Sequence, residues 1–368
     1  MGIDYDQVFE ILPNRVWRTY RGGATLDKIA GQVGEDGHFP EDWVGSATRA
    51  VNMGRENLPD EGVGSARGVD GIEYSMEELY RTDPDRALGR AHIAAYGAQP
   101  HLLVKLLDAA MRLHIQAHPS VSWAREHLGA ESGKTEAWWV LATREEEAWV
   151  YLGFQRPPTP RVWRRIIAEQ DLVAMAGCFD KVPVKSGDVL LIEGGVPHAI
   201  GPGIFMVEIQ EPTDYVVRCE YAHGGLTLDE SARTMGLGLE RVLDLFDYAE
   251  YPLSEVKERF GPQIEIVAEA DGGREESVLT APQTDRLELR RVECSDGLRL
   301  DSDGRFSILI VTEGSGRILA GGRELALRPW SRCFLPASLA DVSVEGVLRA
   351  VRCLPPQPRS ASPSRPLS

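Results

Sequence analysis

The segment from Leu113 to Trp139 is the most informative part of the sequence about the fold, and it reads LHIQAHPSVSWAREHLGAESGKTEAWW. It opens with an alternation of apolar and polar side chains, in which Gln116 and His118 are polar positions separated by one residue. Because a β-strand sends successive side chains to opposite faces, Gln116 and His118 are expected to project from the same face. The stretch therefore predicts a strand that carries two potential metal ligands into one enclosed space.

A carboxylate and a second imidazole can complete this site. Glu136 comes directly before the apolar run Ala137–Leu141, which predicts a second strand with a carboxylate at its N-terminal end. His198 follows the tight turn Glu193–Pro197 at the start of another predicted strand. Imidazole, carboxylate and amide oxygen together suit a divalent metal ion. The residues of the predicted metal site are Gln116, His118, Glu136 and His198.

The composition excludes several classes of protein. The chain has 368 residues, and 40 basic against 56 acidic residues give it a net charge of −16, which argues against nonspecific binding to nucleic acid or acidic membranes. No apolar run approaches the length of a membrane span, the N-terminus lacks a signal-peptide pattern, and the cysteines form no CxxC pair. We expect a cytoplasmic protein, a monomer or homodimer, without a nucleic-acid or membrane partner.

Short apolar runs separated by glycine- and proline-rich turns predict a mainly β protein. Two helical insertions are expected, at about 159–176 after the Thr159–Pro160 cap and at about 227–260 after the capping box Thr227–Glu230. The run Pro100–Ala110 is ambiguous between helix and strand, and the polar alternation after it favours a strand.

Shifts in composition divide the chain. Residues 1–265 are expected to form one domain that carries the metal site. Residues 266–285 are charged and poor in large apolar side chains, which predicts a linker. Residues 286–354 repeat short apolar strands and glycine turns, which predicts a small β-domain, and they contain no histidine. Residues 355–368 are rich in Pro and Ser and predict a disordered tail.

Taken together, the motifs resemble those of the cupin superfamily and, within it, the type I mannose-6-phosphate isomerases. The segment Gln116–Pro119 corresponds to the Gln-x-His-Pro of these isomerases, and Gly133–Glu136 is similar to their Lys-Thr/Pro-Glu segment. The turn Glu193–His198 looks like the second cupin motif, Pro-x-Gly-x-x-His, with a glutamate in the place of proline. Val196–Gly201 matches the family's Pro-His-Ala-Ile segment, and Glu208–Arg218 resembles the strand that carries its Asp and Arg.

The likeness covers most of the chain from Asn14 to about Cys353. It implies a cupin (jelly-roll) β-barrel catalytic domain with inserted helices, and a smaller cupin-like C-terminal β-domain without metal ligands. It also implies that one zinc ion per chain is bound by the four residues of the predicted metal site. Lys134, Asp214 and Arg218 would then lie in a sugar-phosphate pocket. The family interconverts mannose 6-phosphate and fructose 6-phosphate.

Aldose–ketose exchange moves a proton between C1 and C2 through an enediol, and negative charge develops on oxygen. Lys134 lies two residues from Glu136, and Arg218 offers two-pronged recognition of an enediolate or a phosphate. As the base we favour Asp214 acting together with Arg218, with Glu208, Lys134 or a metal-bound water as alternatives. His114 shares the face of Gln116 and His118 and is the further histidine of interest.

Two departures from the family pattern leave other functions open. Many members read Trp-Gly-Gly near the N-terminus, whereas here four residues separate Trp17 from Gly22. Close bacterial members carry a second arginine six positions beyond the one matched by Arg218, and here that position is Gly224. An isomerase of a different or unphosphorylated aldose, or a non-catalytic sugar-binding cupin, are therefore the alternatives to be weighed.

Overall fold

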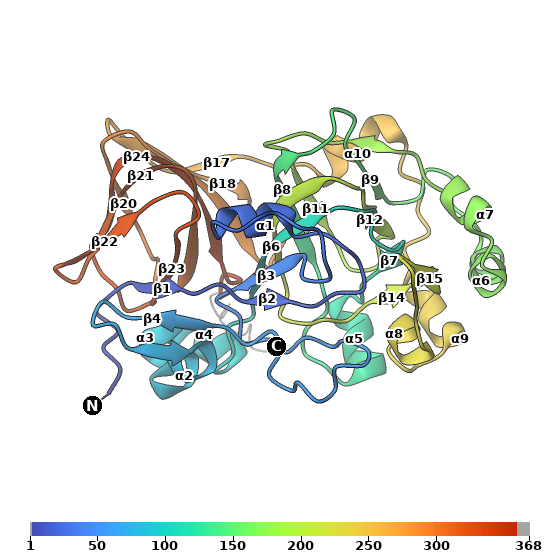
Figure 1. Ribbon diagram of the computed structural model, residues 1–368, viewed down its shortest axis with the longest axis horizontal. Coiled ribbons are helices and arrows are strands. Elements are labelled where there is room, and N and C mark those ends of the chain that lie inside the picture. Colours follow the sequence, from blue (N-terminus) through green and yellow to red (C-terminus); the bar gives the residue numbers. More distant parts are fainter. Residues whose placement is uncertain (1, 359–368) are drawn as a thin grey trace, which may run out of the picture. The chain divides into compact units, whose positions relative to one another are not determined.

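The structure is a computed structural model that describes residues 2–358, and the chain forms two compact units (Figure 1). Unit 2 consists of Pro13–Val63 and Leu103–Pro262. Unit 1 consists of the described residues up to Leu12, Gly64–Leu102 and the described residues from Gln263 onward. Each unit is therefore assembled from segments that are far apart in the sequence.

Two antiparallel sheets form the frame of unit 2, as expected for a mainly β protein (Figure 1). The first has six strands in the order β11-β8-β13-β6-β3-β2, and the second has five in the order β10-β9-β12-β7-β14. The strands of the first sheet are β2 (Arg15–Val16), β3 (Glu41–Val44), β6 (Leu103–Ala109), β8 (Glu136–Thr143), β11 (Val189–Ile192) and β13 (Ile204–Gln210). Those of the second are β7 (Gln116–Ala117), β9 (Trp149–Leu152), β10 (Val182–Pro183), β12 (His198–Ile200) and β14 (Val217–Arg218). The strand prediction for Pro100–Ala110 is confirmed by β6.

Alternation along the strands separates an apolar core from the polar pocket described below. Leu107 and Met206 of the first sheet share one buried core with Ile200 of the second. On the segment around β7, Ile115 and Ala117 belong to a different buried core. The residues between and beside them, His114, Gln116 and His118, line the pocket. The expectation that these three side chains share a face is confirmed.

Helices, strands and loops together supply the second core of unit 2. α6 (Pro160–Glu169) begins where the sequence predicts, since Thr159 Oγ1 accepts a hydrogen bond from the Val162 N–H at 3.3 Å. Its residues Trp163 and Ile166 are buried in that core together with Ile115 and Ala117. The remaining helices of unit 2 are α1 (Ala24–Ile29), α5 (Val121–Leu128), α7 (Leu172–Gly177), α8 (Glu230–Thr234), α9 (Leu239–Val242), the 3₁₀ helix η1 (Leu243–Leu245) and α10 (Leu253–Phe260).

The second helical insertion begins differently from the prediction. Thr227 is not a cap but lies in the short strand β16 (Leu226–Thr227), which pairs with β15 (Ala222–His223). The cap of α8 is Asp229, whose carboxylate accepts a hydrogen bond from the Ala232 N–H at 2.8 Å. Asp and Thr are both good caps, and strand pairing of Thr227 leaves Asp229 as the first residue free to cap the helix.

Unit 1 contains an eleven-stranded antiparallel sheet in which the chain's first strand is an interior member (Figure 1). β1 (Phe9–Ile11) pairs with β23 (Arg332–Leu335) on one side and with β4 (Ser65–Arg67) on the other. The other strands are β5 (Glu73–Ser75), β17 (Glu265–Ala270), β18 (Gly273–Leu279), β19 (Glu288–Cys294), β20 (Gly297–Leu300), β21 (Ser307–Ala320), β22 (Arg323–Leu327) and β24 (Val342–Leu354). Its helices are α2 (Met76–Thr82), α3 (Pro84–Ala87) and α4 (Arg90–Tyr96).

The predicted domain boundaries need correction. The described residues up to Leu12 and Gly64–Leu102 belong with the C-terminal strands rather than with the metal-site domain. The predicted linker 266–285 is wrong, because β17 and β18 form a hairpin there. β17 is an edge strand with mostly exposed residues, so it lacks the apolar alternation by which a strand is recognised. Residues 359–368 of the predicted tail lie outside the described residues.

Two further features concern the whole described chain. In residues 2–358 no helix combines the length and the apolar character needed to cross a membrane. The five cysteines are buried and unbonded to one another.

A buried network of opposite charges stabilises unit 1. Arg352 Nη1 contacts Glu275 Oε1 at 2.9 Å, and Arg290 Nη1 lies 3.5 Å from the same oxygen. Glu275 and Arg352 are essentially inaccessible to solvent. Opposite charges at this depth compensate each other, so the removal of one partner leaves the other uncompensated.

We expect Glu275→Ala to lower the free energy of unfolding by about 3–5 kcal/mol, because two guanidinium groups then lose a buried counter-charge. Urea unfolding followed by circular dichroism measures the change. Glu313→Ala is the matched control, since its contact with Arg349 at 3.2 Å is exposed; such a pair contributes about 0–1 kcal/mol. Equal effects of the two substitutions would contradict the importance of the buried network.

Candidate metal centre

Strand register brings distant residues to one place in unit 2. In the second sheet β7 lies between β12 and β14, and Gln116 is paired with His198 on one side and with Arg218 on the other. In the first sheet Glu136 begins β8 and is paired with Gln210 of β13. Four segments that are up to 102 positions apart (116 to 218) therefore meet at one end of the two sheets.

The turn before His198 has the backbone that its glycines require. Gly195 has φ of 96°, a conformation that residues with a side chain rarely adopt. A Cβ atom on Gly194 would come within 2.6 Å of the backbone of Ser120, so the turn packs closely against the loop after His118. The Gly195 N–H also donates to the carbonyl oxygen of His118 at 2.7 Å. These contacts hold the two histidine segments together.

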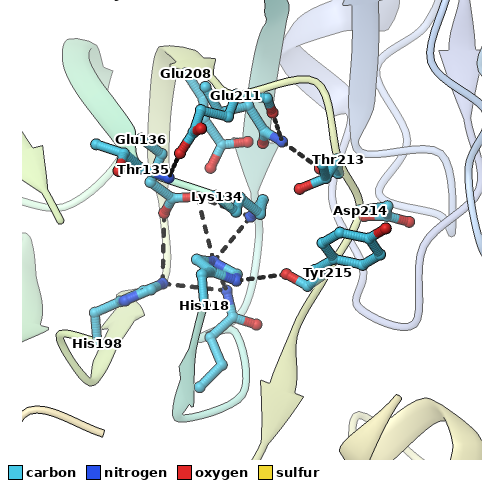
Figure 2. A network of polar contacts seen from close by, with 12 residues as sticks. His118, Lys134, Thr135, Glu136, His198, Glu208, Glu211, Thr213, Asp214 and Tyr215 are labelled. Atoms are coloured by element: carbon cyan, nitrogen blue, oxygen red, sulfur yellow. Dashed lines mark hydrogen bonds and ion pairs between the residues drawn. The ribbon is translucent and has the colours of Figure 1, made fainter. Parts of the chain in front are cut away.

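Three of the four predicted ligands converge (Figure 2). His118 Nε2 lies 3.2 Å from Glu136 Oε2, and His198 Nε2 lies 3.4 Å from Glu136 Oε1. All three ligand atoms lie within 4.8 Å of one another. Within residues 2–358 this is the one group of three or more His, Cys, Asp or Glu side chains that could hold a metal ion.

Backbone groups orient both imidazoles. His118 Nδ1 lies 2.8 Å from the carbonyl oxygen of Tyr215, and His198 Nδ1 lies 2.9 Å from that of Val196. Because a carbonyl oxygen can only accept, each Nδ1 carries the proton and each Nε2 presents its lone pair to the centre. Trp138 Nε1 donates to Glu136 Oε1 at 3.0 Å and fixes the carboxylate.

The fourth predicted ligand, Gln116, is in position to contribute. Its amide nitrogen lies 3.3 Å from His198 Nε2 and 3.5 Å from His118 Nε2. The oxygen and nitrogen of an amide exchange places by a half-turn about the last side-chain bond. That rotation would direct Oε1 toward the imidazoles, which is the orientation a metal ligand needs.

The protonation states suit a cation. Burial lowers the pKa of His118 to about 3, with the Lys134 ammonium adding to the effect, and burial also lowers the pKa of His198. For Glu136, burial acts to raise the pKa, but Lys134 and the imidazoles outweigh it and hold the pKa well below its usual range. Two neutral imidazoles and one carboxylate are the forms that bind a metal ion near neutral pH.

Lys134 lies inside this centre. Its Nζ atom is 2.8 Å from His118 Nε2 and 2.8 Å from Glu136 Oε2. The loop that carries it is held by Glu211, whose carboxylate accepts hydrogen bonds from the Gly133 N–H at 3.2 Å and the Thr135 N–H at 2.9 Å (Figure 2). Glu211 therefore holds the backbone on both sides of Lys134.

The centre opens onto a narrow pocket of unit 2 with a cavity volume of about 30 Å³. Eight charged side chains meet in or beside this pocket. The cations are Arg18, Lys105, Lys134 and Arg218, and the carboxylates are Glu41, Glu136, Glu208 and Asp214.

Asp214 is not paired with Arg218 as predicted. Both of its oxygens are bound by Arg18, at 2.8 Å each, and Oδ2 also accepts from the Val51 N–H at 2.9 Å. Although burial raises its pKa, Arg18 outweighs this effect, so the pKa lies far below the usual range for aspartate. In Figure 2 Asp214 lies apart from the two histidines. The prediction that Asp214 acts with Arg218 as the base is therefore not supported by the geometry.

Arg218 itself faces the pocket with a half-buried guanidinium. Its Nη1 donates to the carbonyl oxygen of Ala232 at 2.6 Å, which fixes one edge of the group. Burial, with the nearby Arg18 charge, lowers the pKa of Arg218 to about 10, so it remains a cation at neutral pH. Glu220, which could have paired with it, binds Arg112 instead at 2.6 Å.

A second set of charges lies deeper in the first sheet. Glu208 and Lys105 are cross-strand partners, and Lys105 Nζ lies 2.6 Å from Glu208 Oε2. Burial raises the pKa of Glu208 above its usual range despite the lysine. Glu41 accepts hydrogen bonds from Tyr20 Oη and Trp43 Nε1, both at 2.6 Å.

Four residues of the pocket are absent from the predicted site: Arg18, Tyr20, Glu41 and Lys105. Lys105 had a signal, because it is a charged residue inside the apolar run that forms β6. Arg18 and Tyr20 lie among the four residues between Trp17 and Gly22. This segment differs from the Trp-Gly-Gly pattern of the family, but the difference alone does not indicate a function for either residue. For Glu41, the partner Trp43 is two positions away, but Tyr20 and Lys105 are distant in sequence.

Comparisons with known proteins identify similar sequences and folds. Residues 277–355 match the family model described as the mannose-6-phosphate isomerase cupin domain. The mannose-6-phosphate isomerase of Streptococcus mutans is 26% identical over 303 residues, which cover 80% of this chain and 89% of that protein. The probable mannose-6-phosphate isomerase GmuF of Bacillus subtilis is 26% identical over 67% of this chain and 72% of that protein.

Solved structures share the fold. The mannose 6-phosphate isomerase of Bacillus subtilis superposes with a TM-score of 0.72 at 19% identity and covers 94% of this chain and 99% of its own. The Salmonella typhimurium enzyme, solved with fructose 6-phosphate and zinc, gives a TM-score of 0.70 at 14% identity over 95% of this chain and 100% of its own. The cupin fold prediction is confirmed, and the predicted resemblance to the type I mannose-6-phosphate isomerases is supported by the family model, the relatives and the solved structures.

Proposed function

We propose that this protein is a zinc-dependent isomerase that interconverts mannose 6-phosphate and fructose 6-phosphate through an enediol. The observation that carries the proposal is the convergence of His118, Glu136 and His198 beside Gln116 at a pocket that also holds Lys134 and Arg218. The names of the relatives, and the sugar phosphate and zinc in the Salmonella typhimurium structure, support the same reaction.

The donor set fits a divalent metal ion. Two oriented imidazoles, one carboxylate and one amide provide four ligands in a mixed N/O site, with Gln116, His118, Glu136 and His198 as the ligands. The lysine ammonium at 2.8 Å from His118 Nε2 and Glu136 Oε2 shows that these lone pairs face a position suited to a cation. When bound, a divalent ion supplies Lewis-acid polarisation of a carbonyl oxygen and stabilises developing negative charge.

The charge balance of the pocket favours an anionic substrate. Four cationic side chains oppose four carboxylates, so the site is close to neutral without a metal ion. With a divalent cation in place, it carries a net positive charge and attracts a phosphorylated sugar. Arg218, with one edge fixed by Ala232, can direct its other N–H groups toward a phosphate or an enediolate oxygen.

We favour Glu208 as the base, which is one of the alternatives named from the sequence. The reaction removes the proton on C2 of the aldose and returns a proton to C1, while a hydroxyl proton moves from O2 to O1. A carboxylate with a raised pKa is a stronger base than Asp214, whose lone pairs are engaged by Arg18. Lys134 and Arg218 would stabilise the charge on O1 and O2 during the transfer.

The direct test is a coupled assay of fructose 6-phosphate formation from mannose 6-phosphate, on protein of measured metal content. We expect one zinc ion per chain and turnover that is lost on chelation and in His198→Ala. His127→Ala is the control, because His127 lies outside the pocket and packs against Trp123. Bound zinc without turnover would refute the named substrate, and protein that binds no divalent metal would refute the metal centre.

Lys134 competes with a metal ion for two lone pairs. Lys134→Met keeps the length of the side chain but removes the ammonium, so we expect tighter zinc binding and, because charge stabilisation is lost, a fall in kcat of about 100-fold or more. Zinc affinity is measured by competition with a chromogenic chelator, and kcat by the coupled assay. Weaker zinc binding in this variant would show that the lysine supports the metal rather than competing with it.

The two carboxylates proposed for the base can be separated. We expect Glu208→Gln to reduce kcat by about 100-fold or more with zinc retained, since the amide cannot accept the C2 proton. Asp214→Asn should mainly raise KM, because it frees Arg18 to move in the pocket. Slow exchange of the C2 proton with deuterated water in Glu208→Gln alone would support this assignment, and near-normal exchange would exclude Glu208 as the base.

A further inference from the structure

His114 is the pocket histidine to which the proposed mechanism gives no role. The residue is 2% exposed and lines the pocket beside Gln116 and Arg218. Within residues 2–358, its Nε2 atom is buried and has no hydrogen-bond partner. Most buried polar atoms in folded proteins are paired, so an unpaired one in a binding pocket points to a ligand group.

The surrounding side chains do not satisfy this imidazole. The His223 ring contacts His114 at a tilt of 55° with ring centres 4.8 Å apart, but His223 Nε2 bonds the carbonyl oxygen of Arg112. The other two histidines of the pocket wall and centre, His118 and His198, each have Nδ1 held by a backbone carbonyl. His114 thus differs from its neighbours in having its ring held by packing alone.

The position of His114 indicates what it can reach. Gln116 and His114 are two residues apart on one extended segment, so their side chains project side by side, roughly 6.6 Å apart along the strand. His118 lies on the opposite side of Gln116 from His114. A sugar whose C1–C2 end lies at the metal centre would therefore pass His114 with a later part of its carbon chain.

We propose that His114 binds a hydroxyl group of the sugar chain, beyond the reacting carbons, and so contributes to substrate specificity. A neutral imidazole has one donor and one acceptor, which match the donor and acceptor of a hydroxyl. The neighbouring guanidinium of Arg218 is the better partner for a phosphate. The inference rests on the proposed isomerase function and adds a binding contact to it.

The test compares His114→Phe with wild type in the mannose 6-phosphate assay. Phenylalanine keeps a ring in the cavity but cannot form the hydrogen bond, so we expect KM to rise about 2- to 12-fold, the range for one lost neutral hydrogen bond. Zinc content should not change. Because the lost nitrogen has no partner in the free protein, the urea midpoint should stay equal or increase.

Two comparisons make the result decisive. His127→Phe, on α5 outside the pocket, controls for the exchange itself and should leave KM unchanged. His114→Gln retains a donor and an acceptor and should recover part of the lost affinity. An unchanged KM in His114→Phe, with or without a loss of stability, would overturn the inference while wild-type turnover still upholds the isomerase; an inactive wild type would refute both.

Discussion

The buried carboxylate of Glu136 imposes the constraint on which the centre of unit 2 depends. A carboxylate without access to water is stable only if opposite charge and hydrogen bonds replace its hydration. Here the Lys134 ammonium and the Trp138 indole do so. The same ammonium lies 2.8 Å from His118 Nε2, and His198 Nε2 lies 3.4 Å from Glu136 Oε1, so the segments that carry the two histidines meet around this ion pair. The same requirement makes the centre receptive to a metal ion, which can replace the lysine as the compensating cation.

Compensation of charge extends through the whole pocket. Glu41 is held by Tyr20, Trp43 and Lys105, Glu208 by Lys105, and Asp214 by Arg18. Since the carboxylates have different sets of partners, they differ in basicity even though all are buried. Arg18 makes Asp214 a weak base that shapes the pocket, whereas burial leaves Glu208 able to accept a proton. The surroundings of each carboxylate thus set its basicity.

The residues of this site that could be predicted are those marked by patterns of neighbouring residues in the sequence. Alternation around Gln116 and His118, the apolar run after Glu136 and the glycine turn before His198 each depend on neighbouring residues, and the structure brings all four together. The pairing of Arg18 with Asp214 joins residues 196 positions apart and depends on the complete fold. The same reason explains the error at 266–285, because an exposed edge strand such as β17 is defined by its partner and not by an apolar pattern of its own.

The position of β1 in the sheet of unit 1 has a consequence for synthesis on the ribosome. β1 leaves the ribosome first, but its partner β23 (Arg332–Leu335) is among the last strands to appear. All segments of unit 2 are available once Pro262 has emerged from the ribosome. Unit 2 can therefore fold before β1 pairs with β23. During translation the N-terminal segment must therefore remain unpaired on that side. Vectorial synthesis favours a folding order in which the unit that carries the chemistry is completed before the unit that contains both ends of the described chain.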